Sequence, residues 1–195
     1  MENVFIGAGG FANEVAADLG YRPKMFVDDE YCDHKKTLPL SAFDSNKYKA
    51  LIVVGNPKIR YELFKKLPSN TTYWTHISKN SIILDSNNSI GDGTIICSGV
   101  IVTTNCFIGN HVHLNIQTTI GHGCTINNFV TTAPSVNISG DVEISDSVYL
   151  GTNSSVKEKV RICSDVVIGL NCGVVKDINE SGTYIGCPAK KIINR

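Results

Sequence analysis

The chain lacks the features that would point to a nucleic acid, a membrane or an export route. Charged residues make up 18% of it, and the 18 basic residues balance the 18 acidic ones, so no basic surface is expected. The start, MENVFIGAGG, has neither the basic nor the long apolar region of a signal peptide. Apolar runs such as ALIVV are too short to cross a bilayer. We expect a soluble, cytoplasmic protein without nucleic-acid or membrane partners.

Residues 1–75 alternate strand-like and helix-like segments. The runs NVFIG, KMFVDD and KALIVVG are short and apolar, whereas GGFANEVAADLGY and NPKIRYELFKKL space their apolar residues as a helix does. This order predicts an α/β domain with a small, Rossmann-like parallel sheet.

From about residue 76 the sequence repeats every six residues. Counted from Leu84 to Val174 without an insertion, fifteen of the sixteen positions are Leu, Ile or Val, and Thr132 is the exception. A second series of small or β-branched residues lies four places after the first. A hexapeptide period predicts a parallel β-helix, in which three units form one coil and residues 18 apart stack about 4.8 Å from each other. We therefore expect an all-β domain over residues 76–195, ending in a short C-terminal extension.

The repeat also predicts the role of most of the seven cysteines. Without an export signal, reduced thiols are expected. Cys106, Cys124 and Cys172 fall in the small inward series, so they are interpreted as packing residues. Although Cys124 is two residues from His122, its inward position argues against a catalytic Cys–His pair.

Several motifs together resemble one known family. The six-residue repeat, IGHG at 120–123 and GCPAKKI at 186–192 resemble the left-handed β-helix (hexapeptide-repeat) acyltransferases. The N-terminal IGAGG, VDD and VGNPKIR are similar to the nucleotide-aminosugar N-acetyltransferases, grouped with the sialic acid O-acetyltransferases. This resemblance implies acetyl-CoA as the co-substrate, a nucleotide-linked amino sugar as the acceptor, and a homotrimer with active sites between neighbouring β-helices.

The N-terminal domain carries the expected sugar-nucleotide site. In FIGAGGFANE, glycines join a strand to a helix and would let the backbone approach a phosphate, although the third glycine of a dinucleotide fingerprint is replaced by Ala12. A tight turn without a ligand is the alternative. The aspartates of VDD would accept hydrogen bonds from a uracil or thymine ring or from a ribose, or would lie in a solvated turn. Arg60 would face either a phosphate or solvent. The substrate-binding residues that the resemblance implies are Gly9, Gly10, Phe11, Asp28, Asp29, Gly55 and Asn56.

His122 belongs to neither inward series, so a core histidine is a poor interpretation and a plain surface histidine is the alternative. By resemblance it is the catalytic base, and an imidazole with a pKa of about 6.5 is largely neutral at pH 7 and can accept a proton from an amine. Relatives carry Glu or Asp directly after this histidine, where this chain has Gly123. We hypothesise that Asp141, one coil later, supplies the carboxylate, and that Asn115 is a second possible orienting group. Both would otherwise be ordinary outward-facing polar residues.

The resemblance also implies acyl-CoA contacts. Thr131 stands where relatives place a histidine. Gly140 would offer its N–H to the thioester oxygen, and Lys190 would reach a CoA phosphate or be a simple surface lysine. The implied acyl-CoA-binding residues are Thr131, Gly140, Thr152 and Leu170.

The predicted activity is direct transfer of an acetyl group from acetyl-CoA to the amine of a UDP- or dTDP-linked 4-amino-deoxysugar, with no metal. Three alternatives remain open. The first is an O-acetyltransferase acting on sialic acid or another sugar. The second is a γ-type carbonic anhydrase that binds zinc through His111, His113 and His122. The third is a non-catalytic sugar-nucleotide binder, which the missing carboxylate at Gly123 would suit.

Overall fold

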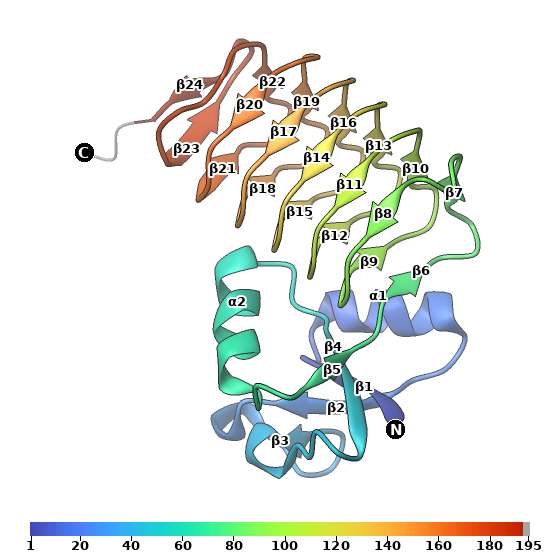
Figure 1. The fold of residues 1–195 in the computed structure, drawn as a ribbon. Coiled ribbons are helices and arrows are strands. Elements are labelled where there is room, and N and C mark those ends of the chain that lie inside the picture. Colours follow the sequence, from blue (N-terminus) through green and yellow to red (C-terminus); the bar gives the residue numbers. More distant parts are fainter. Residues whose placement is uncertain (193–195) are drawn as a thin grey trace.

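The computed structural model describes residues 1–192 and has two parts (Figure 1). The N-terminal part is a five-stranded parallel sheet in the order β3-β2-β1-β4-β5, with two helices. Its elements are β1 (Glu2–Ile6), α1 (Gly10–Leu19), β2 (Lys24–Val27), η1 (Asp29–Tyr31), β3 (Leu38–Pro39), η2 (Leu40–Ala42), β4 (Tyr48–Ile52), α2 (Pro57–Lys66) and β5 (Thr72–Tyr73). The predicted strands and helices are confirmed, whereas the two-residue strands β3 and β5 are too short to give a periodic signal.

Both helices have boundaries that the sequence explains. α1 ends at Gly20, which adopts the left-handed conformation (φ 76°) and donates its N–H to the Ala17 carbonyl. α2 starts after Asn56, whose side-chain oxygen accepts hydrogen bonds from the N–H groups of Lys58 and Ile59 at 3.0 and 3.2 Å. Pro57 is the first helical residue, where a missing N–H is not needed.

The second part is a three-sided parallel β-helix, as predicted from the six-residue period. We call its sides face 1, face 2 and face 3. Face 1 contains β6 (His76–Ile77), β9 (Ile95–Ile96), β12 (His113–Leu114), β15 (Thr131–Thr132), β18 (Tyr149–Leu150), β21 (Val166–Ile168), β23 (Gly182–Ile185) and the antiparallel β24 (Lys190–Lys191). Face 2 contains β7 (Ile82–Ile83), β10 (Ile101–Val102), β13 (Thr119–Ile120), β16 (Asn137–Ile138), β19 (Ser155–Val156) and β22 (Gly173–Val174). Face 3 contains β8 (Ser89–Ile90), β11 (Phe107–Ile108), β14 (Thr125–Ile126), β17 (Glu143–Ile144) and β20 (Arg161–Ile162).

The coils repeat every 18 residues except at the start and at the C-terminal end, where Val166 pairs with Gly182, 16 residues later. Ile120 pairs with Ile138, and both fill the interior. In the first coil, however, Val102 pairs with Ile83 and not with Leu84, whose side chain is 62% exposed. The prediction of an uninterrupted column from Leu84 was therefore wrong by one residue, because the first coil is one residue longer than the others.

The inward cysteines are packing residues, as predicted. Cys106, Cys124 and Cys172 are at most 2% exposed. Burial raises the pKa of the Cys124 thiol to about 11, so the thiol stays protonated at neutral pH. The Cys124 thiol donates a hydrogen bond to the Ser139 carbonyl at 3.0 Å.

A buried arginine joins the two parts. Arg60 of α2 is 0% exposed, so both predictions for it, a phosphate contact and a solvated helix surface, were wrong. Within residues 1–192 no carboxylate forms a salt bridge with it; seven polar groups surround it instead. These acceptors, at 2.7 to 3.2 Å, are the carbonyl oxygens of Val54, Gly55, His111, Phe129 and Val130, Oγ1 of Thr131 and Nδ1 of His113.

The α/β part consequently packs against face 1 and the corner between faces 3 and 1. Phe11 of α1 lies against His113, with ring centroids 5.1 Å apart, and Tyr61 of α2 contacts Phe129 edge-on at 5.2 Å. At the first coil, His76 and Ser78 bind the Asp18 carboxylate of α1 at 2.7 and 2.9 Å. In the part of the chain that the structure describes, no helix has the length and apolar character that crossing a membrane requires.

Candidate active site

His122 lies on an exposed corner of the β-helix, between β13 of face 2 and β14 of face 3. Its side chain is 67% exposed, and Nδ1 is 3.6 Å from Oδ1 of Asp141, which is 49% exposed. The backbone holds the two residues together, because the Asp141 N–H donates to the His122 carbonyl at 2.7 Å. The structure thus places an imidazole beside the carboxylate that the sequence suggested.

Two glycines make room for this pair. Gly123 has a left-handed backbone (φ +67°), and a Cβ there would lie 2.4 Å from Oδ1 of Asp141. A Cβ on Gly140 would lie 2.6 Å from both Cε1 and Nε2 of His122, so the imidazole sits directly on the backbone of that residue. A side chain at position 123 would therefore displace the Asp141 carboxylate from its present place and would need a left-handed backbone that L side chains rarely adopt. Glycine at this position leaves the corner to the Asp141 carboxylate.

A second group of predicted residues lies on face 1 and at the corner between faces 1 and 2. Phe11, Gly55, Asn115 and Thr152 line one cavity of about 210 Å³. Thr131 also lines it, but its hydroxyl accepts from Arg60 at 2.8 Å and donates to the Gly55 carbonyl at 2.8 Å, so that hydroxyl is already occupied. The Asn115 side-chain oxygen accepts from the Ile116 N–H at 2.7 Å. Within residues 1–192, Asn115 forms no hydrogen bond with His122.

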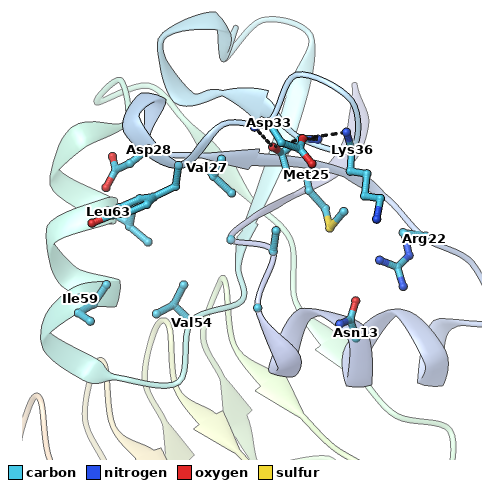
Figure 2. A pocket seen from close by; sticks show the side chains of 15 residues that line it. Asn13, Arg22, Met25, Val27, Asp28, Asp33, Lys36, Val54, Ile59 and Leu63 are labelled. Carbon is cyan, nitrogen blue, oxygen red and sulfur yellow. Dashed lines mark hydrogen bonds between the residues drawn. The ribbon is translucent and has the colours of Figure 1, made fainter.

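A cavity of about 560 Å³ opens at the carboxyl ends of the central strands of the α/β sheet (Figure 2). Gly9 and Asp28 line it, and the Asp28 side chain also accepts from Lys66 of α2 at 2.8 Å. Gly9 has φ −77°, and a Cβ built there or on Gly10 meets nothing within 4 Å. The fold does not itself require glycine at these two positions, and the space above them is open to a ligand.

Sequence reasoning missed most polar residues of this cavity. They are Asn13, Arg22, Tyr31, Asp33, Lys36 and Thr37. Arg22 follows α1 in a turn, and Lys36 lies in the irregular loop before β3, so neither falls in a periodic or motif-like segment. The one sequence feature that could have indicated a role in this cavity is that Arg22 is a basic residue soon after the first predicted helix.

The remaining predicted residues have separate surroundings. Asp29 lies in a neighbouring cavity, where hydrogen bonding by the Ser41 side chain and by the Ser41 N–H, which donates at 3.0 Å, lowers the pKa of its carboxyl. The Asn56 side chain caps α2. Leu170 is 70% exposed at the corner between faces 1 and 2, and Lys190 is exposed in β24.

The histidines of the zinc alternative are not gathered around one point. His111 and His113 are buried at the Arg60 junction, while His122 is exposed on another corner. Burial and the neighbouring guanidinium lower the pKa of His111 to about 4 and that of His113 well below its ordinary value. Within residues 1–192 no three His, Cys, Asp or Glu side chains cluster as metal ligands would. A cation beside the Arg60 guanidinium would be repelled, so the chain's own geometry disfavours this alternative.

In a three-sided prism, the corner between faces 2 and 3 is opposite face 1. His122 occupies that corner, whereas the α/β part packs on face 1 and its junction with face 3 (Figure 1). Within one chain the imidazole and the 560 Å³ cavity are therefore on opposite sides of the β-helix.

Solved structures with this fold match nearly the whole chain. One is a histidine-to-asparagine variant of perosamine N-acetyltransferase from Caulobacter crescentus in complex with CoA and GDP-perosamine, with a TM-score of 0.89 and 21% identity over 100% of this chain and 98% of that one. The acetyltransferase domain of PglB from Neisseria gonorrhoeae, in complex with acetyl coenzyme A, has a TM-score of 0.84 and 23% identity over 97% and 98%. WeeI from Acinetobacter baumannii has a TM-score of 0.86 and 24% identity over 98% and 100%. No family model matches the chain. The chain shares the fold of these proteins, including both of its parts.

Proposed function

We propose that this protein is an acetyl-CoA-dependent N-acetyltransferase acting on the amino group of a nucleotide-linked 4-amino-deoxysugar. The observation that carries the proposal is the match of both parts, in one chain, to acetyltransferases solved with CoA or acetyl coenzyme A, one of them also with GDP-perosamine. In this proposal the β-helix is left-handed, and residues 1–75 form a Rossmann-like domain that binds the nucleotide. GDP joins UDP and dTDP as a candidate nucleotide because of the perosamine enzyme.

His122 acts as the general base. Its neutral imidazole accepts a proton from the sugar amine while the nitrogen attacks the carbonyl carbon of the thioester. The tetrahedral intermediate then collapses, the carbon–sulfur bond breaks, and the proton is delivered to the departing thiolate. The amide and free CoA are the products, and no acyl-enzyme forms. Variants of perosamine N-acetyltransferase with one histidine changed to Asn or Ala were solved with CoA and GDP-perosamine, which supports a central role for a histidine in that enzyme.

Asp141 positions the imidazole. With Nδ1 toward Oδ1 of Asp141 at 3.6 Å, the opposite ring nitrogen is free to meet the amine. A shift of well under 1 Å would turn this contact into a charge-assisted hydrogen bond and would stabilise the imidazolium as it forms.

The active site is proposed to form between copies of the chain. The nucleotide cavity lies in the α/β part, which packs on the side of the β-helix opposite His122. Phe11 of α1 lies on that side as well, whereas Asn115 and Thr152 stand at the corner between faces 1 and 2, the full width of face 2 away from the His122 corner. Transfer within one chain would need the sugar to reach around the prism. A cyclic trimer in which His122 of one copy meets face 1 of the next brings the groups together.

The experiment is an acetylation assay with acetyl-CoA and a panel of UDP-, dTDP- and GDP-linked amino sugars, with free sialic acid as an O-acceptor. We expect turnover of at least one nucleotide amino sugar and a loss of about 10²-fold or more in His122→Asn. Turnover of free sialic acid alone would support the O-acetyltransferase instead. Binding of a nucleotide sugar without turnover of any would support the non-catalytic binder.

A further inference from the structure

Two cationic side chains lie uncompensated on one side of the 560 Å³ cavity. Figure 2 shows Lys36 extending toward Arg22, with Asn13 of α1 below them. Arg22 and Lys36 are 14 positions apart in the sequence, and the fold brings them to the same side of the cavity. Neither forms a salt bridge within residues 1–192. Like charges that converge repel each other, and an anionic ligand between the two side chains would offset this cost.

Hydrogen bonds to the Asp33 carboxylate fix the loop that carries Lys36. Oδ1 of Asp33 accepts the N–H groups of Lys35, Lys36 and Thr37 at 3.2, 2.9 and 3.0 Å and the Thr37 hydroxyl at 3.0 Å. These bonds lower the pKa of Asp33 to about 2. Asp33 also lines the cavity. The four donors of its own loop all bind Oδ1 and hold the Lys36 backbone in place, and within residues 1–192 the Asp33 carboxylate forms no salt bridge with the Lys36 ammonium.

The opposite side of the cavity is apolar, with a carboxylate hydrogen-bond acceptor at one end. Val54, Ile59 and Leu63 face the row formed by Asn13, Arg22 and Lys36 (Figure 2). Asp28 lies at the apolar end, and its second carboxylate oxygen is not engaged by Lys66. The cavity is therefore divided into a donor-rich half and an apolar half with one carboxylate, and its volume is in the range of small-ligand sites.

We propose that Arg22, Lys36 and Asn13 bind the diphosphate of the sugar nucleotide, and that its base lies against Val54, Ile59 and Leu63. This inference rests on the proposed function and assigns one part of the ligand to each half. Arginine and lysine are suited to phosphate oxygens, and the Asn13 amide adds a neutral donor. A base with a ring N–H, such as uracil, thymine or guanine, would donate to Asp28.

The test is calorimetric titration of the full chain with UDP, dTDP, GDP and the corresponding nucleosides. The variants are Arg22→Ala, Lys36→Ala and the double variant. Lys35→Ala is the matched control, because Lys35 is a neighbouring exposed lysine that does not line the cavity. We expect each single variant to weaken nucleoside diphosphate binding about tenfold or more, the double variant to remove most of the advantage of diphosphates over nucleosides, and Lys35→Ala to change nothing.

Two results would overturn the assignment of the diphosphate to Arg22, Lys36 and Asn13, and they have different consequences for the proposed function. If the wild type binds a nucleoside diphosphate and the double variant binds it equally well, the diphosphate contact is wrong while the proposed function stands. If the wild type binds none of the three diphosphates, the proposed function fails together with it. Both variant positions are exposed, and unchanged unfolding temperatures would show that the fold is intact.

Discussion

The buried histidines at the Arg60 junction should make the protein sensitive to mild acid. In the unfolded chain His111 and His113 bind protons below about pH 6.5. In the folded chain, burial and the neighbouring Arg60 guanidinium lower the pKa of His111 to about 4 and that of His113 well below its ordinary value, so both rings stay neutral in mild acid. Because the unfolded state binds more protons, stability falls as the pH drops through this window. From pH 7 to pH 5 each histidine costs about 2 kcal/mol, hence about 4 kcal/mol for the pair. This is a large share of a typical stability of about 5–15 kcal/mol.

The assay is urea unfolding followed by circular dichroism at pH 7, 6 and 5. The lowest pH of this series, pH 5, lies above the range in which carboxylates such as Asp33, with a pKa of about 2, would change the unfolding free energy. His111→Phe should reduce the loss to about 2 kcal/mol, because it removes one of the two histidines. A phenylalanine suits this corner, since Phe129 adopts the same left-handed conformation one coil later, φ 57° against 54°.

The matched control is His34→Asn, which removes an exposed histidine with φ 55°. It should leave the acid dependence unchanged. Equal stability of the wild type at pH 7 and pH 5, or an undiminished loss in His111→Phe, would refute this account of the junction.

Three further predictions concern the active-site corner and the junction. Gly123→Glu should lower both stability and acetylation, because a left-handed Glu costs about 1–2 kcal/mol and its Cβ would collide with Asp141. Adding Asp141→Gly to this variant should recover acetylation. If it does not, the carboxylate cannot be exchanged between the two positions. Asp141→Asn should change the pH profile of acetylation while Asp165→Asn, at another left-handed corner, should not; identical profiles would remove the positioning role. Arg60→Met should reduce the unfolding free energy by on the order of 3–5 kcal/mol because it leaves buried carbonyls without donors, and a near-neutral effect in urea unfolding would contradict its role in joining the two parts.

Much of the fold could be predicted because its determinants are periodic. The six-residue period predicts the β-helix, and the alternation of apolar runs and amphipathic segments predicts the strands and helices of residues 1–75. The extra residue near Leu84 was missed because Ile82, Ile83 and Leu84 are all aliphatic, and the period alone does not distinguish between them.

The residues whose roles depend on three-dimensional contacts could not be predicted. Arg60 resembles any basic residue on an amphipathic helix, and its burial depends on carbonyl groups about 50 to 70 residues away. Arg22 and Lys36 belong to no motif, and only the folded loop brings them together. The proximity of His122 and Asp141 could be predicted, because Asp141 lies 18 residues after Gly123, in the column of the residue that directly follows His122.

The most direct test of a shared active site is complementation between two inactive variants. One is His122→Asn. The other is Gly9→Phe, which places a bulky ring at the 560 Å³ cavity from a position where an added Cβ meets no atom within 4 Å. Each variant alone should be inactive. After the two are unfolded and refolded together in equal amounts, a trimer with sites between copies predicts about one quarter of the wild-type acetylation, because one site in four combines an intact imidazole with an intact cavity. Mixtures that remain inactive, although they contain both variants in one oligomer, would contradict the account.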